Sequence, residues 1–137
     1  MNFGIVGCGF IAKKHAKAIQ EIDGANLVAV SDKIPEAMTF YVEEYGAEPY
    51  TDLSDMLEKK DIDIVCICTP TGLHAPLAIQ VANAKKHIIL EKPIAMTLEE
   101  TDQIIDVCHN NGVKLSIVHP NRYRPVVKEL RKIMDQN

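Results

Sequence analysis

The amino-acid sequence predicts an α/β fold, in which a doubly wound parallel sheet lies between two layers of helices to give three αβα layers. Short apolar runs of strand type alternate along the chain with longer amphipathic segments of helix type. The loops between them are short, and no internal repeat or low-complexity stretch interrupts the alternation. Because parallel strands need a crossover connection, usually a helix, this alternation favours a parallel sheet.

The expected elements follow one another along the whole chain. The expected strands are the apolar runs at 3–6, 27–30, 48–50, 62–68, 87–90 and 113–118. The expected helices are the segments at 11–22, 35–45, 54–57, 73–84, 97–109 and 126–134.

Proline and glycine mark helix ends in the first half of the chain. Pro35 suits a first helical position, because its φ is already fixed at a helical value and its missing N–H is not needed there. Gly46 is expected to end the same helix. The short helix that ends at Leu57 has two candidate N-caps, Asp52 and Ser54, whose side-chain oxygens can accept a hydrogen bond from the first turn.

The second half carries the strongest strand and the clearest helix start. The run 62–68 is almost continuously apolar, as expected of a central parallel strand that is covered on both faces. Residues 97–100 read Thr-Leu-Glu-Glu, a capping box that predicts a helix N-terminus. Gly112, which follows two asparagines, is expected to close that helix.

The turn after the first strand has the spacing G-x-G-x-x-A, with Gly7, Gly9 and Ala12 at the small positions. Gly7 allows a tight turn, Gly9 allows a pyrophosphate to approach the backbone, and Ala12 allows the following helix to pack closely on the strand. The start of that helix, at Phe10 and Ile11, offers free N–H groups and a partial positive charge to the phosphates. The turn therefore predicts a dinucleotide site, and a bare packing turn between strand and helix is the alternative.

An acidic residue follows at the distance that this interpretation requires. Asp32 stands twenty positions after Ala12, just past the second strand. A carboxylate there can accept hydrogen bonds from the ribose hydroxyls of an adenosine and repel a 2′-phosphate. The predicted cofactor is therefore NAD, and NADP stays open because Lys33 stands beside the acid.

The composition gives no reason to expect nucleic acid or a membrane as a partner. The chain has 137 residues, of which 47% are hydrophobic and 25% charged, with a formal net charge of −4. No apolar run approaches the roughly 20 residues of a membrane span, and the N-terminus has no secretion signal, so a cytoplasmic location is expected. The cysteines form no CxxC pair, so they are expected to be buried thiols and not metal ligands. They are Cys8, Cys66, Cys68 and Cys108.

Polar residues cluster where the predicted strands end, which is the edge at which open parallel sheets bind ligands. Lys92 is the strongest candidate for chemistry. A lysine at the end of a buried strand has a partly desolvated ammonium, which suits proton transfer or a hydrogen bond to a substrate hydroxyl. Glu91 can pair with Lys92 or help to hold a cofactor ribose or amide, and Pro93 fixes the turn. The alternative for Lys92 is an ordinary surface lysine.

Two further groups are candidates at the same edge. His74 stands in the first turn of a helix, where it can touch cofactor or substrate, or serve as a capping or core histidine. His119, Asn121 and Arg122 follow the last strand, and a guanidinium there suits a phosphate or carboxylate. A surface salt bridge is the alternative for Arg122.

Three motifs, taken in order, resemble the glucose–fructose oxidoreductase/inositol dehydrogenase/MocA family across essentially the whole chain. They are the glycine turn from Gly7 to Ala12, Cys68-Thr69-Pro70 with His74, and Glu91-Lys92-Pro93. The resemblance implies an NAD(P)-dependent oxidoreductase with a Rossmann fold, which oxidises a sugar or cyclitol hydroxyl to a ketone or reverses that step. It also implies that Lys92 is the active-site lysine and that Thr69, Pro70 and Glu91 line the cofactor cleft. Residues 119–123 are similar to members that act on nucleotide-linked amino sugars, such as UDP-N-acetylglucosamine-type 3-dehydrogenases.

Members of this family continue into a second domain that completes the substrate pocket and supports oligomers. Residues 1–120 are therefore expected to form the dinucleotide-binding domain, and 121–137 a helix leading toward a domain that this chain lacks. The chain alone is expected to bind NAD(H) with little or no turnover, and the full-length protein to be a homo-oligomer. A non-catalytic NAD-responsive module, in which Lys92 and His74 merely contact the cofactor, is the second hypothesis. An S-adenosylmethionine methyltransferase is a third, which leaves the lysine motif unexplained.

Overall fold

The computed structural model describes residues 1–136 and contains one six-stranded sheet in which every paired strand is parallel. The spatial order is β3-β2-β1-β4-β5-β6, so the chain leaves the centre at β1 in one direction and returns to build the other half from β4. The strands are β1 (Asn2–Val6), β2 (Asn26–Ser31), β3 (Glu48–Tyr50), β4 (Ile64–Ile67), β5 (His87–Leu90) and β6 (Leu115–Ile117). The predicted doubly wound parallel sheet is confirmed.

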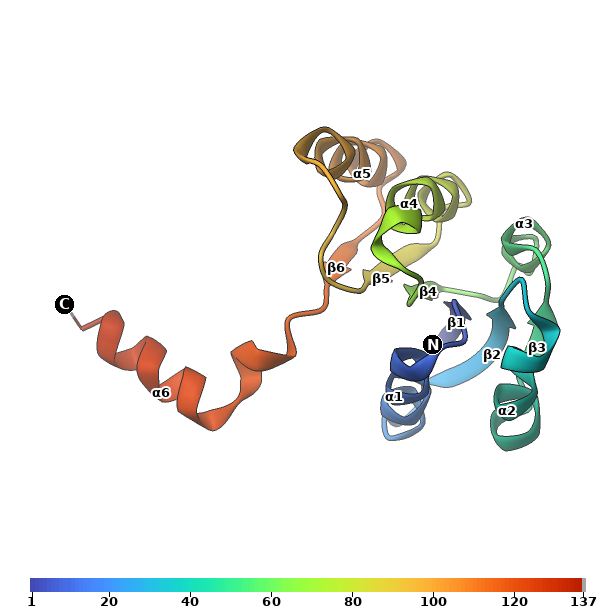
Figure 1. Ribbon diagram of the computed structural model, residues 1–137, viewed down its shortest axis with the longest axis horizontal. Helices are drawn as coiled ribbons and strands as arrows, with labels where there is room; N and C mark the ends of the chain where they lie inside the picture. Colours follow the sequence, from blue (N-terminus) through green and yellow to red (C-terminus); the bar gives the residue numbers. More distant parts are fainter. Residues whose placement is uncertain (137) are drawn as a thin grey trace.

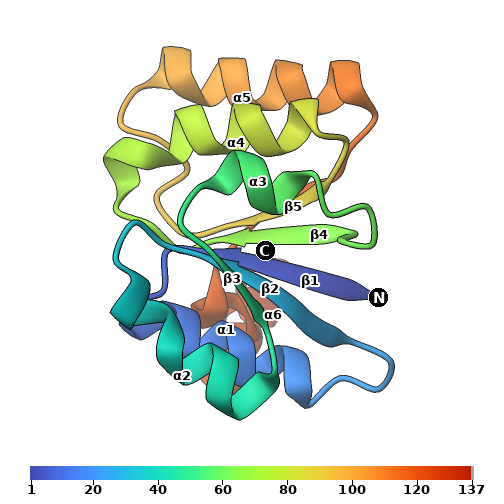
Figure 2. The same cartoon turned by 90° about the vertical axis from the view of Figure 1, so that its right-hand side faces the viewer.

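Helices connect the successive strands and lie in two layers, one on each side of the sheet (Figures 1 and 2). The helices are α1 (Phe10–Gln20), α2 (Pro35–Tyr45), α3 (Leu53–Leu57), α4 (His74–Asn83), α5 (Leu98–Asn111) and α6 (Pro125–Met134). Two short 3₁₀ turns, η1 (Thr71–Leu73) and η2 (Pro120–Tyr123), precede α4 and α6. The first two helices cover one face, whereas α3, α4 and α5 cover the other.

Each helix layer has its own core. Against α1 and α2 the sheet packs a cluster that includes Ile5, Val30 and Tyr41. Against α3, α4 and α5 it packs a cluster that includes Ile67 and Leu90. Central strands that contribute side chains to both clusters read as apolar runs, which is why the sequence revealed them.

Several predicted element ends differ from the observed ones. The strand expected at 62–68 pairs only over Ile64–Ile67, and the strand expected at 113–118 only over Leu115–Ile117. Each apolar run extends beyond the residues that pair in the sheet, because residues next to the strand are buried or hydrogen-bonded in the loops. The sequence therefore predicts strands that are longer than the observed ones. Val118 N, for example, donates to Leu90 O at 2.9 Å beyond the end of β6.

The predicted caps are largely observed. Asp52, not Ser54, is the N-cap of α3, since its Oδ1 accepts from Ser54 N at 2.8 Å. Thr97 caps α5 by accepting from Glu100 N at 3.1 Å. The capping box is only half formed, because the Glu100 carboxylate accepts from Met96 N instead of returning to Thr97 N.

The sheet is not covered equally along its width. Among the described residues, no helix covers the face of β5 and β6 opposite α4 and α5, and α6 projects away from the sheet (Figure 1). No residue of α6 is buried. Among residues 1–136, no helix has the length and apolar character of a membrane span, and no group of His, Cys, Asp and Glu side chains could hold a metal ion.

Candidate functional site

A cavity of about 580 Å³ opens at the carboxyl ends of β1, β2 and β4. It lies where the strand order reverses direction, between β1 and β4, which is the usual ligand position in open α/β sheets. Six of the residues predicted to bind a cofactor line it: Gly7, Gly9, Asp32, Lys33, Thr69 and Pro70.

The two glycines of the turn do different work. Gly7 has φ +86°, and a Cβ there would lie 2.8 Å from the backbone nitrogen and the Cγ2 of Thr69. Glycine is therefore required for the approach of the first turn to the loop after β4. A Cβ on Gly9 would meet nothing within 4 Å, so this position faces open space in the cavity wall.

The start of α1 suits an anionic group. Gly9 is its N-cap and makes no side-chain capping bond, and the first turn contains no acidic residue. The backbone N–H groups of that turn are left for a ligand, and the helix dipole favours negative charge there. On the opposite wall, the buried Thr69 Oγ1 has no hydrogen-bond partner within residues 1–136. An uncapped helix start and an orphaned hydroxyl fit a polar, phosphate-bearing cofactor.

Asp32 has a role within the fold that the sequence did not reveal. Its Oδ2 accepts from Cys8 N at 2.7 Å, and its Oδ1 accepts from Ile34 N at 2.9 Å. The carboxylate thus holds the glycine turn against the end of β2 while lining the cavity. Each carboxylate oxygen keeps a further lone pair, so Asp32 can still accept from ribose hydroxyls.

Lys33 lies at the rim of the cavity and is paired with the cap of α3. Its Nζ lies 3.1 Å from Asp52 Oδ2. The backbone N–H of Ser54, followed by Lys33, lowers the pKa of Asp52. The lysine that the sequence placed beside the ribose site is therefore already engaged by a carboxylate, through an exposed contact.

Cys8 lies inside the glycine turn but is not available for chemistry. Its side chain is buried, and its Sγ lies 3.8 Å from Ser31 O. Burial, followed by the nearby Asp32 carboxylate, raises the pKa of the Cys8 thiol to about 12. The thiol stays protonated at neutral pH. All four cysteines are free and buried, as the sequence predicted.

The Glu91-Lys92-Pro93 turn follows β5 and contains a cis Lys92-Pro93 bond. Glu91 is buried, and its Oε1 lies 3.0 Å from His15 Nε2, a contact that the sequence did not suggest. Lys92 is exposed, and within residues 1–136 its Nζ makes no hydrogen bond or ion pair. The desolvation of Lys92 expected from its place after a buried strand is therefore not provided by this chain.

His74 is placed as a core residue, which the sequence left as an alternative. Only 1% of the residue is exposed, and it does not line the cavity. Its Nδ1 lies 2.8 Å from Pro93 O and its Nε2 lies 3.0 Å from Thr69 O. Both ring nitrogens thus face backbone carbonyl oxygens, and a neutral ring donates to one of them. The core position that the sequence left as an alternative is the one observed.

The other predicted residues lie outside the cavity. Phe10 and Ile11 begin α1, where the Phe10 ring is exposed beside Lys14 Nζ at 5.2 Å. His119 and the η2 residues Asn121 and Arg122 are exposed between β6 and α6. Within residues 1–136, no side chain makes a hydrogen bond or an ion pair with the side chains of these three residues.

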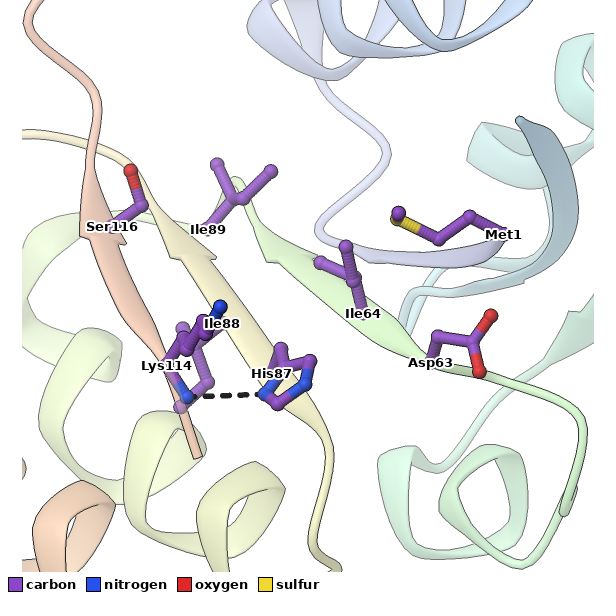
Figure 3. A pocket seen from close by; sticks show the side chains of 8 residues that line it. All are labelled: Met1, Asp63, Ile64, His87, Ile88, Ile89, Lys114 and Ser116. Atoms are coloured by element: carbon purple, nitrogen blue, oxygen red, sulfur yellow. Dashed lines mark hydrogen bonds between the residues drawn. The ribbon is translucent and has the colours of Figure 1, made fainter. Parts of the chain in front are cut away.

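A second cavity, also about 580 Å³, lies on the uncovered face of the sheet and at the amino ends of its strands (Figure 3). Ile64 and Ile89 form its apolar floor. Two of its polar groups are already used, because Asp63 Oδ2 accepts from Asn2 N and His87 Nδ1 accepts from Lys114 N. It contains none of the residues that the sequence singled out.

Comparison with known proteins gives a consistent result. The profile of the Gfo/Idh/MocA family, described as "Oxidoreductase family, NAD-binding Rossmann fold", matches residues 1–119. Inositol 2-dehydrogenase of Rhizobium meliloti (strain 1021) is 39% identical over 136 residues, which is 98% of this chain and 41% of the relative.

Solved structures agree over nearly the whole chain. The WlbA dehydrogenase from Bordetella pertussis, in complex with NADH and UDP-GlcNAcA, superposes with a TM-score of 0.95 at 39% identity. The scyllo-inositol dehydrogenase from Lactobacillus casei, with bound NAD(H) and scyllo-inositol, has a TM-score of 0.91 at 30% identity. Both matches cover 99% of this chain, but only 40% and 41% of those chains. The chain therefore spans about two fifths of the length of its relatives.

Proposed function

The chain belongs to the glucose–fructose oxidoreductase/inositol dehydrogenase/MocA family, and from this we propose that it is the NAD(P)-binding domain of a dehydrogenase. The proposed enzyme transfers hydride between nicotinamide and a secondary hydroxyl of a sugar, nucleotide sugar or cyclitol. The observation that carries the proposal is the cavity at the strand reversal. It combines an uncapped helix start, an open glycine wall and a carboxylate, and the Lys92 turn follows on a neighbouring strand end.

The residues of this chain divide the binding work among them. The first N–H groups of α1 hold the pyrophosphate, Asp32 holds the adenosine ribose, and Thr69 Oγ1 donates to the cofactor from the opposite wall. The nicotinamide, when bound, supplies the hydride acceptor or donor. Lys92 holds the reacting hydroxyl and assists removal of its proton, as its position after β5 and its unengaged Nζ allow.

The proposed substrate is a polyhydroxylated ring. Relatives of similar identity act on inositols or bind UDP-GlcNAcA, so neither class is favoured by identity alone. We assign substrate contacts to His119, Asn121 and Arg122. These residues follow β6, which is the neighbour of β5 in the sheet, and the Lys92 turn follows β5. A guanidinium at Arg122 suits a phosphate or carboxylate, which favours the nucleotide-sugar branch.

The remaining parts of the proposal concern the protein's surroundings. A cytoplasmic location is supported by four free, buried thiols, which suit a reducing compartment. The proposed partners are a small-molecule substrate and further copies of the full-length protein, without nucleic acid or membrane. The NAD-responsive module stays the second candidate, and it is supported by the exposure of Lys92.

The proposal is tested first by calorimetric titration of the chain with NAD(H) and NADP(H). We expect saturable NAD(H) binding and weaker NADP(H) binding. An Asp32→Asn variant loses the charge and one of the two oxygens that accept from Cys8 N and Ile34 N, so its affinity for NAD(H) is expected to fall about tenfold, or about 1.4 kcal/mol. The Lys92→Met variant serves as a control and should bind NAD(H) normally. No binding by the unmodified chain would overturn the proposed function.

Turnover separates the enzyme from the NAD-responsive module. The full product of the gene that encodes this chain is mixed with NAD⁺ and inositols or UDP-linked amino sugars, and NADH is followed by absorbance. Oxidation of any of these substrates, lost in Lys92→Met with NAD(H) binding retained, is expected. NAD(H) binding without turnover on either class would favour the module.

A further inference from the structure

The buried Glu91 carboxylate joins the first helix to the backbone of the lysine turn. Its Oε1 lies 3.0 Å from His15 Nε2, and its Oε2 accepts from Lys92 N at 3.2 Å. Only 9% of the Glu91 side chain and 13% of the His15 side chain are exposed, so water screens this contact weakly. His15 lies in α1, whose N-terminus forms part of the cofactor cavity.

A second buried histidine holds the same turn from its other end. The Nδ1 and Nε2 of the His74 ring lie 2.8 Å from Pro93 O and 3.0 Å from Thr69 O, and a neutral ring donates to one of these carbonyls. Thr69 and Pro70 line the cavity after β4. The imidazole therefore links the second wall of the cofactor site to the residue immediately after Lys92.

The two histidines approach from opposite layers of the fold. His15 belongs to α1 and His74 to the start of α4, and these helices cover opposite faces of the sheet (Figures 1 and 2). The Lys92 side chain itself is exposed and makes no polar contact within residues 1–136. Its position is consequently set by the backbone on either side of it. A reacting group must be held within a fraction of an ångström for efficient transfer.

We propose that His15 and His74 are positioning residues, which brace the Glu91-Lys92-Pro93 turn against the two walls of the cofactor site. The proposal rests on the proposed function. It adds that cofactor and lysine share their supports: α1 contributes to the phosphate site and braces Glu91, and the Thr69 loop contributes to the opposite wall and braces Pro93. Binding of the cofactor then changes the environment of Lys92, although neither histidine contacts the cofactor.

The test follows the Lys92 side chain while the cofactor binds. Lysines of the chain are labelled by reductive ¹³C-methylation, and the Lys92 signal is identified by its absence in Lys92→Arg. In the unmodified chain, NAD⁺ is expected to shift that signal. In His15→Leu and His74→Leu we expect the shift to fall by half or more, while the calorimetric NAD⁺ affinity stays within about threefold.

Matched variants separate positioning from general stability. His15→Gln keeps a side-chain N–H that can reach Glu91 and is expected to restore the shift. His109→Leu changes an exposed histidine near the end of α5 and should leave it unchanged. If His15→Leu does not fold, His15→Asn replaces it, since its amide is polar but too short to reach Glu91 in place of Nε2. If His74→Leu does not fold, His74→Ser replaces it, since its hydroxyl is polar but too short to reach Pro93 O in place of Nδ1.

The outcomes are distinguishable. If NAD⁺ shifts the Lys92 signal in folded variants of both histidines as much as in the unmutated chain, with NAD⁺ binding retained, this inference is overturned and the proposed function is left intact. Failure of the unmodified chain to bind NAD⁺ overturns the proposed function and this inference with it.

Discussion

Gly7 and Gly9 stand two positions apart in one turn, yet a methyl group at each position meets a different environment. At Gly7 it would lie under 3 Å from the backbone of Cys68 and Thr69, at a φ of +86°. At Gly9 it would lie in open space on the cavity wall. The fold requires the first glycine, and we propose that the ligand requires the second.

We expect Gly7→Ala to destabilise the chain by about 2–4 kcal/mol, because backbone strain and overpacking add. Gly9→Ala should cost less than about 1 kcal/mol of stability, because alanine is a poorer N-cap than glycine. It should weaken NAD(H) binding, because the methyl group enters the space for the pyrophosphate. Urea denaturation measures the first effect and calorimetry the second. Equal stability losses in the two variants would contradict this division.

The buried thiols predict how stability changes with pH. Burial, followed for Cys8 by Asp32, raises the pKa of both Cys8 and Cys66 to about 12. Thiols in an unfolded chain have a pKa of about 8.5, so above that pH the unfolded chain binds fewer protons than the folded one. The stability that these two thiols contribute is therefore fully present below pH 8.5 and is lost as the pH rises toward 12.

Urea denaturation between neutral pH and the alkaline range should show this loss directly. For the fully buried Cys66 the slope approaches about 1.4 kcal/mol per pH unit. The Cys66→Ala variant removes one such proton and is expected to show a shallower alkaline slope than the unmodified chain. A stability that stays constant into the alkaline range in both proteins would show that these thiols titrate normally.

At the scale of elements, helix ends depend on single side chains. Thr97 satisfies Glu100 N at the start of α5, and Gly112 closes the same helix at φ +67°. We expect Thr97→Ala to cost about 1 kcal/mol of stability, because one N–H of the first turn loses its acceptor. Thr97→Ser keeps the hydroxyl and should cost much less. Thermal or urea denaturation of the three proteins gives the comparison.

The last described helix, α6, differs from α1 to α5 because none of its residues is buried. Val126, Leu130 and Met134 lie along one side of α6 and are 72%, 56% and 64% exposed. A helix of ten residues is marginal in water without tertiary packing. Its apolar stripe is therefore suited to burial against further protein.

At the scale of the molecule, the exposed stripe of α6 and the uncovered face of the sheet leave apolar surface in water. Exposed apolar patches promote association. We expect sedimentation velocity to show concentration-dependent self-association of the chain, reduced in Leu130→Glu. Ile64→Glu, on the floor of the second cavity, tests the sheet face separately. A chain that stays monomeric at every concentration would contradict the prediction.

Local patterns were enough for the order and type of the elements. The apolar periodicity predicted the alternation, and the residues that end helices or cap them carry that information in their own backbone or side chain, as Gly46 and Thr97 do. The glycine turn and Asp32 were recognisable because a dinucleotide site needs small residues at fixed spacing. The convergence of Gly7, Asp32 and Thr69 on one cavity followed from the parallel sheet.

Only the tertiary structure decided what the buried polar side chains touch. His15 meets Glu91 across 76 positions of sequence, and His74 meets Pro93 because the crossover from β4 to β5 through α4 brings their loops together. Such contacts depend on helix packing and side-chain direction, which no local pattern encodes. The same holds for the exposure of Lys92, which depends on the atoms around it and not on the strand before it. The sequence by itself determined the sheet, its order of elements and the edge at which we propose that the cofactor binds. The packing of distant segments decided how that edge is braced.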